Sequence, residues 1–297
     1  MPTFAPIMCT VTYLPRPSGF ILTHNRDEAS ARSSQTIVHE KTPGGQTLLF
    51  PRDTLAGGTW IATSRQGRTA CLLNGAFVLH KRTLPYRRSR GLILLDFFDW
   101  KDSDDFFQHY NFENIEPFTF LFFNSSQLPE SLKLSGSSQV TEFRWDGQQR
   151  HLKNLAADQP HFWCSATLYP SEMQIRREQV FRQWLTKHPP ITPSFAASFV
   201  KTTADKKDAA SNQSPSTHHQ APVSSPRSLI SLHLKGSIGD PENDFVMNRA
   251  GKVQTVSITQ VIVHEKSARM RHLDLLGGNR SERRLIRSKR AVTVVNR

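Results

Sequence analysis

Residues 9–24 read CTVTYLPRPSGFILTH, and two β-rich halves flank the central turn residues PRPS. β-Branched and aromatic residues dominate both halves, which is typical of β-strands. Proline and serine favour a turn between them, so this stretch predicts a β-hairpin. In the predicted hairpin, Cys9 lies roughly opposite His24 to Arg26, at the open end.

The run HNRDE, residues 24–28, continues the second strand of this hairpin. The pairing therefore gathers the Cys9 thiol, the Arg26 guanidinium and the carboxylates of Asp27 and Glu28 at one end. A nearby cation lowers the pKa of a thiol, and the thiolate is the reactive form. The open end is a candidate nucleophile site, and a buried, inert strand thiol is the alternative interpretation of Cys9.

A second hairpin is predicted over residues 58–74, where GTWIAT and TACLLN flank SRQGR. Gly67 can take the positive φ that such a turn requires. The pairing places Thr59 near Leu73 or Asn74, again at an open end.

The rest of the chain mixes helical and strand patterns, which predicts an α+β layered domain. A continuous apolar strand is typical of a strand covered on both faces, and residues 118–124 show this character. Helical spacing covers residues 90–100, continuing toward 110, and residues 170–184, and further strand patterns cover residues 245–247 and 253–264.

The sequence divides into one domain over residues 8–265 and a basic C-terminal extension over residues 266–297. The extension has ten Lys or Arg residues against two acidic ones, so it carries +8 of the net charge of +13. Residues 201–227 are rich in Ser, Ala, Lys, Asp, Pro and Gln and are predicted to be an insertion in the domain. We expect this insertion and the end of the chain to be mobile, and the extension to adhere weakly to anionic surfaces without a specific nucleic-acid partner.

Cysteine and apolar patterns favour a cytoplasmic protein. The three cysteines stand far apart without a C-x-x-C pair, which argues against a disulfide framework or a zinc site, and we expect no metal and no cofactor. No apolar run approaches the roughly 20 residues of a membrane helix, and residues 1–7 do not have the pattern of a secretory signal.

An ordered set of short motifs resembles the NRDE family, which is the family of the Transport and Golgi organisation 2 proteins. The resemblance is strong over residues 8–76, fainter at residues 163–169 and 239–260, and absent from the insertion and the extension. The motifs are MCTV at 8–11, NRDE at 25–28, PRD at 51–53, AGGTWIA at 56–62 and LNG at 73–75.

This family is similar to N-terminal-nucleophile hydrolases of the penicillin V acylase and bile-salt hydrolase type. The resemblance implies a four-layer αββα sandwich in which Cys9 is the nucleophile and its own free α-amine is the general base. It further implies that Arg26 and Asp27 position the nucleophile and that Asn74 stabilises the oxyanion. Asn25, Thr59 and Trp60 are the predicted substrate-binding residues.

Two departures from the acylase pattern bear on this interpretation. Eight residues precede Cys9, so its α-amine is in a peptide bond unless Met8 is the initiator or the segment is cleaved. Besides initiation at Met8 and cleavage of the segment, a third possibility is that the site is not catalytic. The late strands also lack a clear counterpart of the second acylase arginine, for which Arg249 is the nearest candidate.

Two functions remain open on the sequence. The first is an enzyme, an amide-bond hydrolase or acyltransferase, that acts on a linear amide or acyl group through an acyl-Cys9 intermediate. The second is a non-catalytic carrier in haem or lipid and acyl trafficking, with a small amide, acyl or haem-like ligand in the same pocket. Haem has no independent support, because no C-x-x-C-H or Cys-Pro sequence occurs. A free amine at residue 9 is required only by the enzyme.

Overall fold

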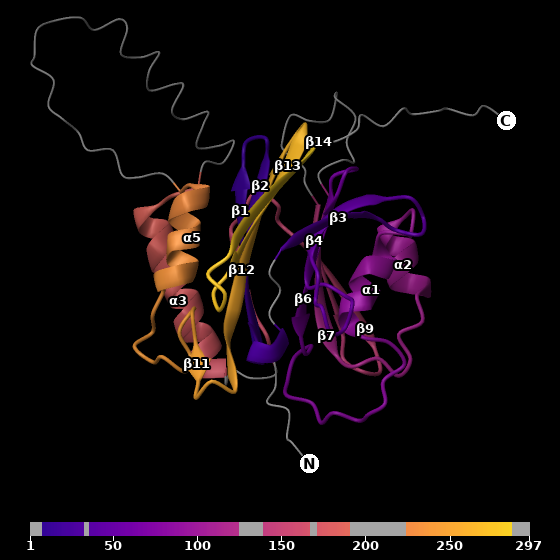
Figure 1. The fold of residues 1–297 in the computed structure, drawn as a ribbon, viewed down its shortest axis with the longest axis horizontal. Coiled ribbons are helices and arrows are strands. Elements are labelled where there is room, and N and C mark those ends of the chain that lie inside the picture. Colours follow the sequence, from indigo (N-terminus) through magenta and orange to yellow (C-terminus); the bar gives the residue numbers. More distant parts are fainter. Residues whose placement is uncertain (1–7, 33–35, 125–138, 167–170, 191–223, 287–297) are drawn as a thin grey trace, which may run out of the picture.

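A computed structural model describes residues 8–32, 36–124, 139–166, 171–190 and 224–286. The chain forms an α+β fold with two seven-stranded antiparallel sheets that lie face to face (Figure 1). Helices cover the outer faces of both sheets, so the layers run helix, sheet, sheet, helix.

The first sheet combines the two ends of the sequence, since strands from residues 8–28 pair with strands from residues 253–286. Its strand order is β10-β1-β2-β12-β13-β14, and β11 pairs with β12. The strands are β1 (Met8–Arg16), β2 (Gly19–Glu28), β10 (His161–Cys164), β11 (Asn248–Arg249), β12 (Val253–His264), β13 (Ser267–Asp274) and β14 (Arg280–Ile286).

The second sheet is an antiparallel meander, in which each strand pairs with the next one in the sequence. Its strands are β3 (Ile37–Lys41), β4 (Thr47–Pro51), β5 (Ile61–Ser64), β6 (Arg68–Asn74), β7 (Phe118–Asn124), β8 (Gln139–Trp145) and β9 (Arg150–Leu155).

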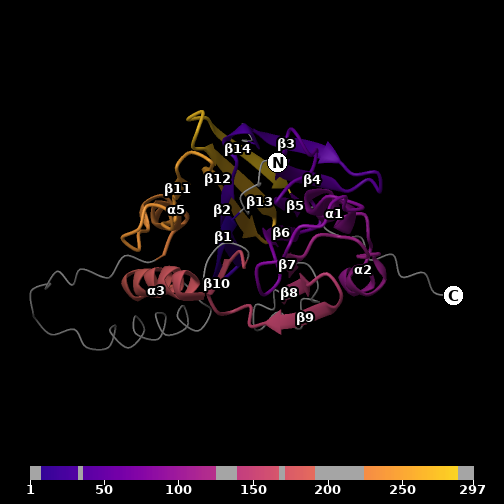
Figure 2. The same cartoon turned by 90° about the horizontal axis from the view of Figure 1, so that it is seen from below.

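Each sheet packs its outer face against its own helices, as the view from below shows (Figure 2). Apolar side chains of α1 (Arg90–Phe97) and α2 (Ser103–His109) pack on the second sheet. Those of α3 (Ser171–Lys187) and α5 (Pro226–Lys235) pack on the first. A 3-10 turn, η1 (Ser30–Arg32), follows β2. Among the described helices, none is both long and apolar enough to span a membrane.

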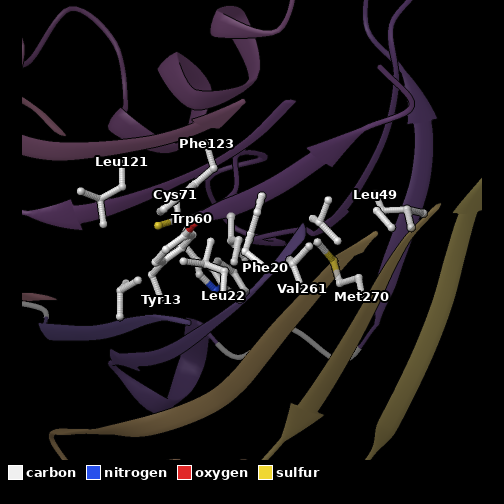
Figure 3. Close-up of a cluster of buried hydrophobic side chains, with 14 of the residues drawn as sticks. Tyr13, Phe20, Leu22, Leu49, Trp60, Cys71, Leu121, Phe123, Val261 and Met270 are labelled. Atoms are coloured by element: carbon white, nitrogen blue, oxygen red, sulfur yellow. The ribbon is translucent and has the colours of Figure 1, made fainter. Parts of the chain in front are cut away.

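The core between the sheets consists of inward-facing side chains from both (Figure 3). Tyr13 and Phe20 from the first sheet meet Phe123 from the second, and the rings of Tyr13 and Phe123 stack with centroids 5.3 Å apart. Burial of such large apolar surfaces on a single face of each strand fixes which side chains of β1 and β2 face inward.

The first predicted hairpin is confirmed. Strands β1 and β2 pair in register, and Cys9 lies directly opposite Arg26. The second is also confirmed, with β5 paired to β6 and Gly67 at a φ of +87° in the turn. The strand over residues 118–124 is buried along its whole length.

The middle of the chain differs from the prediction in two places. The helix expected from residue 90 toward 110 is broken, because Asp102 caps a new helix through the backbone N–H groups of Asp104 and Asp105. Residues 245–247, predicted as a strand, form a bend instead, and Phe245 and Met247 are buried there without sheet pairing.

The residues predicted as a basic extension contribute two strands instead. Strands β13 and β14 pair with one another over residues 267–286, and Ala268, Met270 and Leu285 enter the core between the sheets. The predicted insertion lies outside the described residues as far as 223, and Pro226 and Arg227 already belong to α5. Residues 287–297 also lie outside the described part.

Candidate functional site

Strand alternation sends the residues of the NRDE motif to opposite faces of β2. Successive side chains of a strand point to opposite sides. Arg26, paired with Cys9, faces the second sheet, where its guanidinium lies 4.2 Å from the centroid of the Trp60 ring. Asn25 and Asp27 face the helical side, where they contact His233 and Thr255. The NRDE motif therefore places side chains on both faces of the first sheet, toward the second sheet and toward the helices.

A cavity of about 440 Å³ lies at the open end of the β1–β2 hairpin. It contains five of the seven predicted site residues and joins both sheets to the N-terminus of α1. Asn25 and Asp27 are absent from its lining, contrary to the prediction, because strand alternation points them away. The predicted residues on its walls are Cys9, Arg26, Thr59, Trp60 and Asn74.

Arg26 is held on the cavity wall by a charge-balanced network. Its guanidinium lies 2.5 Å from Asp53 and 3.4 Å from Glu28, and Arg32 contacts the same two carboxylates at 2.7 and 2.9 Å. Arg26 also donates to the carbonyl oxygen of Arg32. Burial of such charges is tolerated when each is paired and hydrogen-bonded, so the network fixes Arg26 firmly.

Glu28 was predicted to lie at the open end of the hairpin but was given no role, and Asp53 was not predicted as a site residue, although the sequence carried signals for both. Glu28 stands two residues beyond Arg26 and therefore shares its face of β2. Asp53 ends the PRD motif and organises the loop after β4, since its Oδ1 accepts from the N–H groups of Leu55 and Ala56. The carboxylates that partner Arg26 in the cavity are thus Glu28 and Asp53, and not Asp27.

Cys9 is buried, with 4% of its surface exposed. Desolvation by burial and the negative charge of Asp27 raise the pKa of the thiol well above its usual value, while Arg26 opposes them only in part. The thiol is therefore neutral, contrary to the expectation that Arg26 would lower its pKa. The backbone N–H of Cys9 donates to the hydroxyl of Ser165 at 3.0 Å, so Ser165 marks where an α-amine at residue 9 would lie.

On the other face, Asn25 and Asp27 tie β2 to its neighbours. Asn25 donates to the carbonyl oxygens of His233 and Phe245 at 3.0 and 2.6 Å, which anchors α5 and the loop after it. Asp27 accepts from the Thr255 hydroxyl at 2.6 Å. Burial raises the pKa of Asp27 to about 7, against the opposing charge of Arg177. Through these hydrogen bonds both residues connect β2 to neighbouring elements.

Within the described residues, no group of three or more His, Cys, Asp or Glu side chains has the arrangement of a metal site.

Comparison with known proteins gives the class of this chain. The family model of Transport and Golgi organisation 2 matches residues 8–271, and the chain belongs to this family. No curated protein matches the sequence.

Two solved structures are similar to this chain. An N-acylethanolamine-hydrolyzing acid amidase ortholog from Caenorhabditis elegans is 9% identical, with a TM-score of 0.47, covering 86% of this chain and 92% of its own. A mutant conjugated bile acid hydrolase from Clostridium perfringens is 10% identical, with a TM-score of 0.42, covering 96% and 99%.

Proposed function

We propose that this protein is a cysteine hydrolase of the N-terminal-nucleophile type that cleaves a linear amide or acyl group through an acyl-Cys9 intermediate. The observation that carries the proposal is the position of Cys9, at the start of β1 and on the wall of a cavity that also holds Arg26 and Asn74. The two stacked sheets with helices outside both support the four-layer αββα sandwich that such hydrolases share.

The reaction begins when Cys9 carries a free α-amine. The amine takes the thiol proton, and the sulfur electron pair attacks the carbonyl carbon of the substrate. The tetrahedral intermediate collapses as the ammonium returns a proton to the leaving amine, which departs and leaves a thioester. Water, deprotonated by the same amine, then attacks the thioester, releases the acid and restores the thiol.

Burial of Cys9 gives the free amine a specific task. In the continuous chain the thiol is neutral, because desolvation disfavours the thiolate. A free amine next to the sulfur, close to Ser165, would remove the proton at the moment of attack without requiring a standing thiolate. Arg26, fixed by Asp53 and Glu28, would stabilise the negative charge that develops on sulfur and oxygen, and the Asn74 amide would donate to the oxyanion.

A non-catalytic carrier of acyl or haem-like ligands is the second candidate, and one observation favours it. When residues precede Cys9, its α-amine is in a peptide bond, and its neutral, buried thiol is a poor nucleophile. In that form Cys9 only lines the cavity beside Trp60 and Leu72. The same cavity then binds its ligand without covalent chemistry.

Trapping of the acyl-enzyme separates the two candidates. Protein beginning at Cys9 is mixed with decanoyl p-nitroanilide, quenched in acid and analysed by intact-mass spectrometry. We expect one decanoyl adduct, mapped to Cys9, which is lost in Cys9→Ser and retained in the matched control Cys164→Ser. An unmodified protein, or an adduct that survives in Cys9→Ser, contradicts the proposal and favours the carrier.

A further inference from the structure

We infer that the cavity contains a separate subsite, formed by Arg82, Arg90 and Glu116, that binds a single carboxylate of the substrate. The inference rests on the proposed function and names its substrate class. The substrate would be an acyl amide with one carboxylate near the scissile bond.

Glu116 fixes the two arginines on the cavity wall. Its Oε1 lies 3.1 Å from Nε of Arg82 and 3.3 Å from Nε2 of His80, and its Oε2 lies 3.1 Å from Arg90. Arg90 also donates to the carbonyl oxygen of Pro117 at 3.1 Å. With two anchors and a side chain only 13% exposed, Arg90 is a rigid donor at a fixed position.

The charges along the cavity wall do not balance at this end. Arg26 and Arg32 are matched by Glu28 and Asp53. Arg88 is matched by the two oxygens of Asp96, each 2.5 Å from a guanidinium nitrogen.

Within the described part of the chain, Glu116 is the one carboxylate that forms ion pairs with Arg82 and Arg90, so one positive charge remains. Burial alone would raise the pKa of Glu116, but the hydrogen bond from His80 and the charges of Arg90 and Arg82 hold this pKa below its usual value. Glu116 is therefore ionised. An anion of one charge would complete the balance, which favours a carboxylate over a doubly charged phosphate.

The N-terminus of α1 lies at the same place and adds to the attraction. Ser89, Arg90 and Gly91 line the cavity, and the Ser89 side chain caps the helix through the N–H of Leu92. The first N–H groups of a helix have no acceptor within it and carry partial positive charge. They would therefore act with Arg82 and Arg90 on the same anion.

The subsite is close enough to Cys9 to serve the same substrate. Arg82, Arg90 and Glu116 line the same cavity as Cys9. Apolar groups line the space around these polar centres, among them Trp60, Leu72 and Leu84, of which Leu84 is 68% exposed. These walls suit an alkyl chain, so the cavity fits a molecule with an apolar acyl end and an anionic end.

Binding to the full chain carrying Cys9→Ala tests the subsite without any turnover. Three probes share one acyl amide: N-octanoyl-β-alanine carries a carboxylate, N-octanoyl-3-aminopropanol is uncharged, and N-octanoyl-2-aminoethyl phosphate is a dianion. Titration calorimetry gives the affinity of each. We expect the carboxylate to bind at least about tenfold more tightly than the alcohol.

Arg82→Gln is the decisive variant, because the Arg82 side chain is 43% exposed and we therefore expect its replacement to leave the fold intact. In this variant the preference for the carboxylate should fall to about twofold or less, while alcohol binding stays unchanged. The matched control is Arg87→Gln, an exposed arginine of the same loop that is not on the cavity wall, and it should retain the preference.

Three results would overturn the subsite: an unchanged preference in Arg82→Gln, tighter binding of the phosphate than of the carboxylate, or no binding of any probe. A failure of the proposed function is distinguishable, because it would appear as absent acylation at Cys9 while the carboxylate preference in the Cys9→Ala background persists.

Discussion

Two buried histidines lie on opposite sides of the first sheet, His24 within β2 itself and His233 in α5, and the pKa of each is lowered by burial. His24 reaches across to the carbonyl oxygen of Leu72 at 3.2 Å. On the other face, His233 of α5 lies 2.6 Å from Oδ1 of Asn25 and 2.7 Å from the hydroxyl of Thr12. Burial lowers the pKa of His24 to about 4 and that of His233 to about 3, so both are neutral at pH 7.

These lowered pKa values make stability depend on pH in a definite direction. Below the usual histidine pKa of about 6.5, the unfolded chain binds protons that the folded chain excludes. Each histidine therefore contributes stability above that pH, and the contribution declines as the pH falls. Asp27 has the opposite effect, because burial raises its pKa to about 7. Between the ordinary pKa of an aspartate and about pH 7, its contribution to stability declines as the pH rises.

A variant isolates the contribution of one histidine. The slope of unfolding free energy against pH, measured by urea titration between about pH 4 and pH 6, should be smaller in His233→Gln by about 1.4 kcal/mol per pH unit. His39→Gln, at an exposed position of β3, is the control and should keep the original slope. Parallel curves for His233→Gln and the unmodified protein would mean that His233 is not held neutral in the fold.

At the scale of elements, the site depends on close contact between a loop and a helix. The N–H of Thr59 donates to the carbonyl oxygen of Gly91 at 3.1 Å. Within the loop, the N–H of Asp53 donates to the carbonyl oxygen of Gly58 at 2.8 Å. A Cβ at Gly58 would lie 2.5 Å from the carbonyl carbon of Gly91, so only glycine permits this approach. The contact brings the N-terminus of α1 to the cavity.

Gly58→Ala should accordingly lower the free energy of unfolding by about 1–3 kcal/mol, since backbone atoms of α1 must move to accept the methyl group. The same variant should weaken binding of N-octanoyl-β-alanine. Gly57→Ala is the comparison: its φ of +70° makes alanine strained, but no atom lies within 4 Å of the new Cβ. It should lose stability with no loss of affinity, measured by urea titration and calorimetry. Equal affinities for all three proteins would show that the loop–helix contact does not shape the cavity.

Local patterns were enough to predict the two hairpins and to place Cys9 opposite Arg26, because strand period and turn residues are short-range signals. The same period would have assigned Asn25 and Asp27 to the far face and Glu28 to the cavity. Asp27 was predicted from the family resemblance, which carries no information on the face of the strand to which its side chain points.

Strands β13 and β14 were missed for a different reason. Their composition is basic and polar, which is typical of an extension, although their pairing is local, since β13 forms hairpins with β12 and with β14. Arg269 and Arg271 lie on the outer face beside Glu282, while Ala268, Met270 and Leu285 alternate into the core. The alternation of apolar and charged residues over these short stretches indicates strands, but the high net charge of the segment favoured the prediction of an extension.

At the scale of the whole molecule, two sheets from distant parts of the sequence meet at the candidate site. The first sheet contributes Cys9, Arg26 and Glu28, and the second sheet and its loops contribute Asn74, Asp53 and Trp60. The two arginine clusters on the cavity wall, Arg26 with Arg32 and Arg82 with Arg90, were not predictable from the sequence, because they require both sheets and α1 to be in place. The pairing of each arginine cluster with its own carboxylates arises only in the assembled fold.

The central claim is that the α-amine of Cys9 is the base that activates its own thiol. Two proteins test it: one begins at Cys9, and the other retains residues 1–8 in a form that cannot be cleaved. The measurement is the steady-state release of p-nitroaniline from decanoyl p-nitroanilide at pH 7. We predict turnover by the first protein and at least about a hundredfold slower turnover by the second, which is the loss expected when a general base is removed. Equal turnover by the two proteins would contradict the claim.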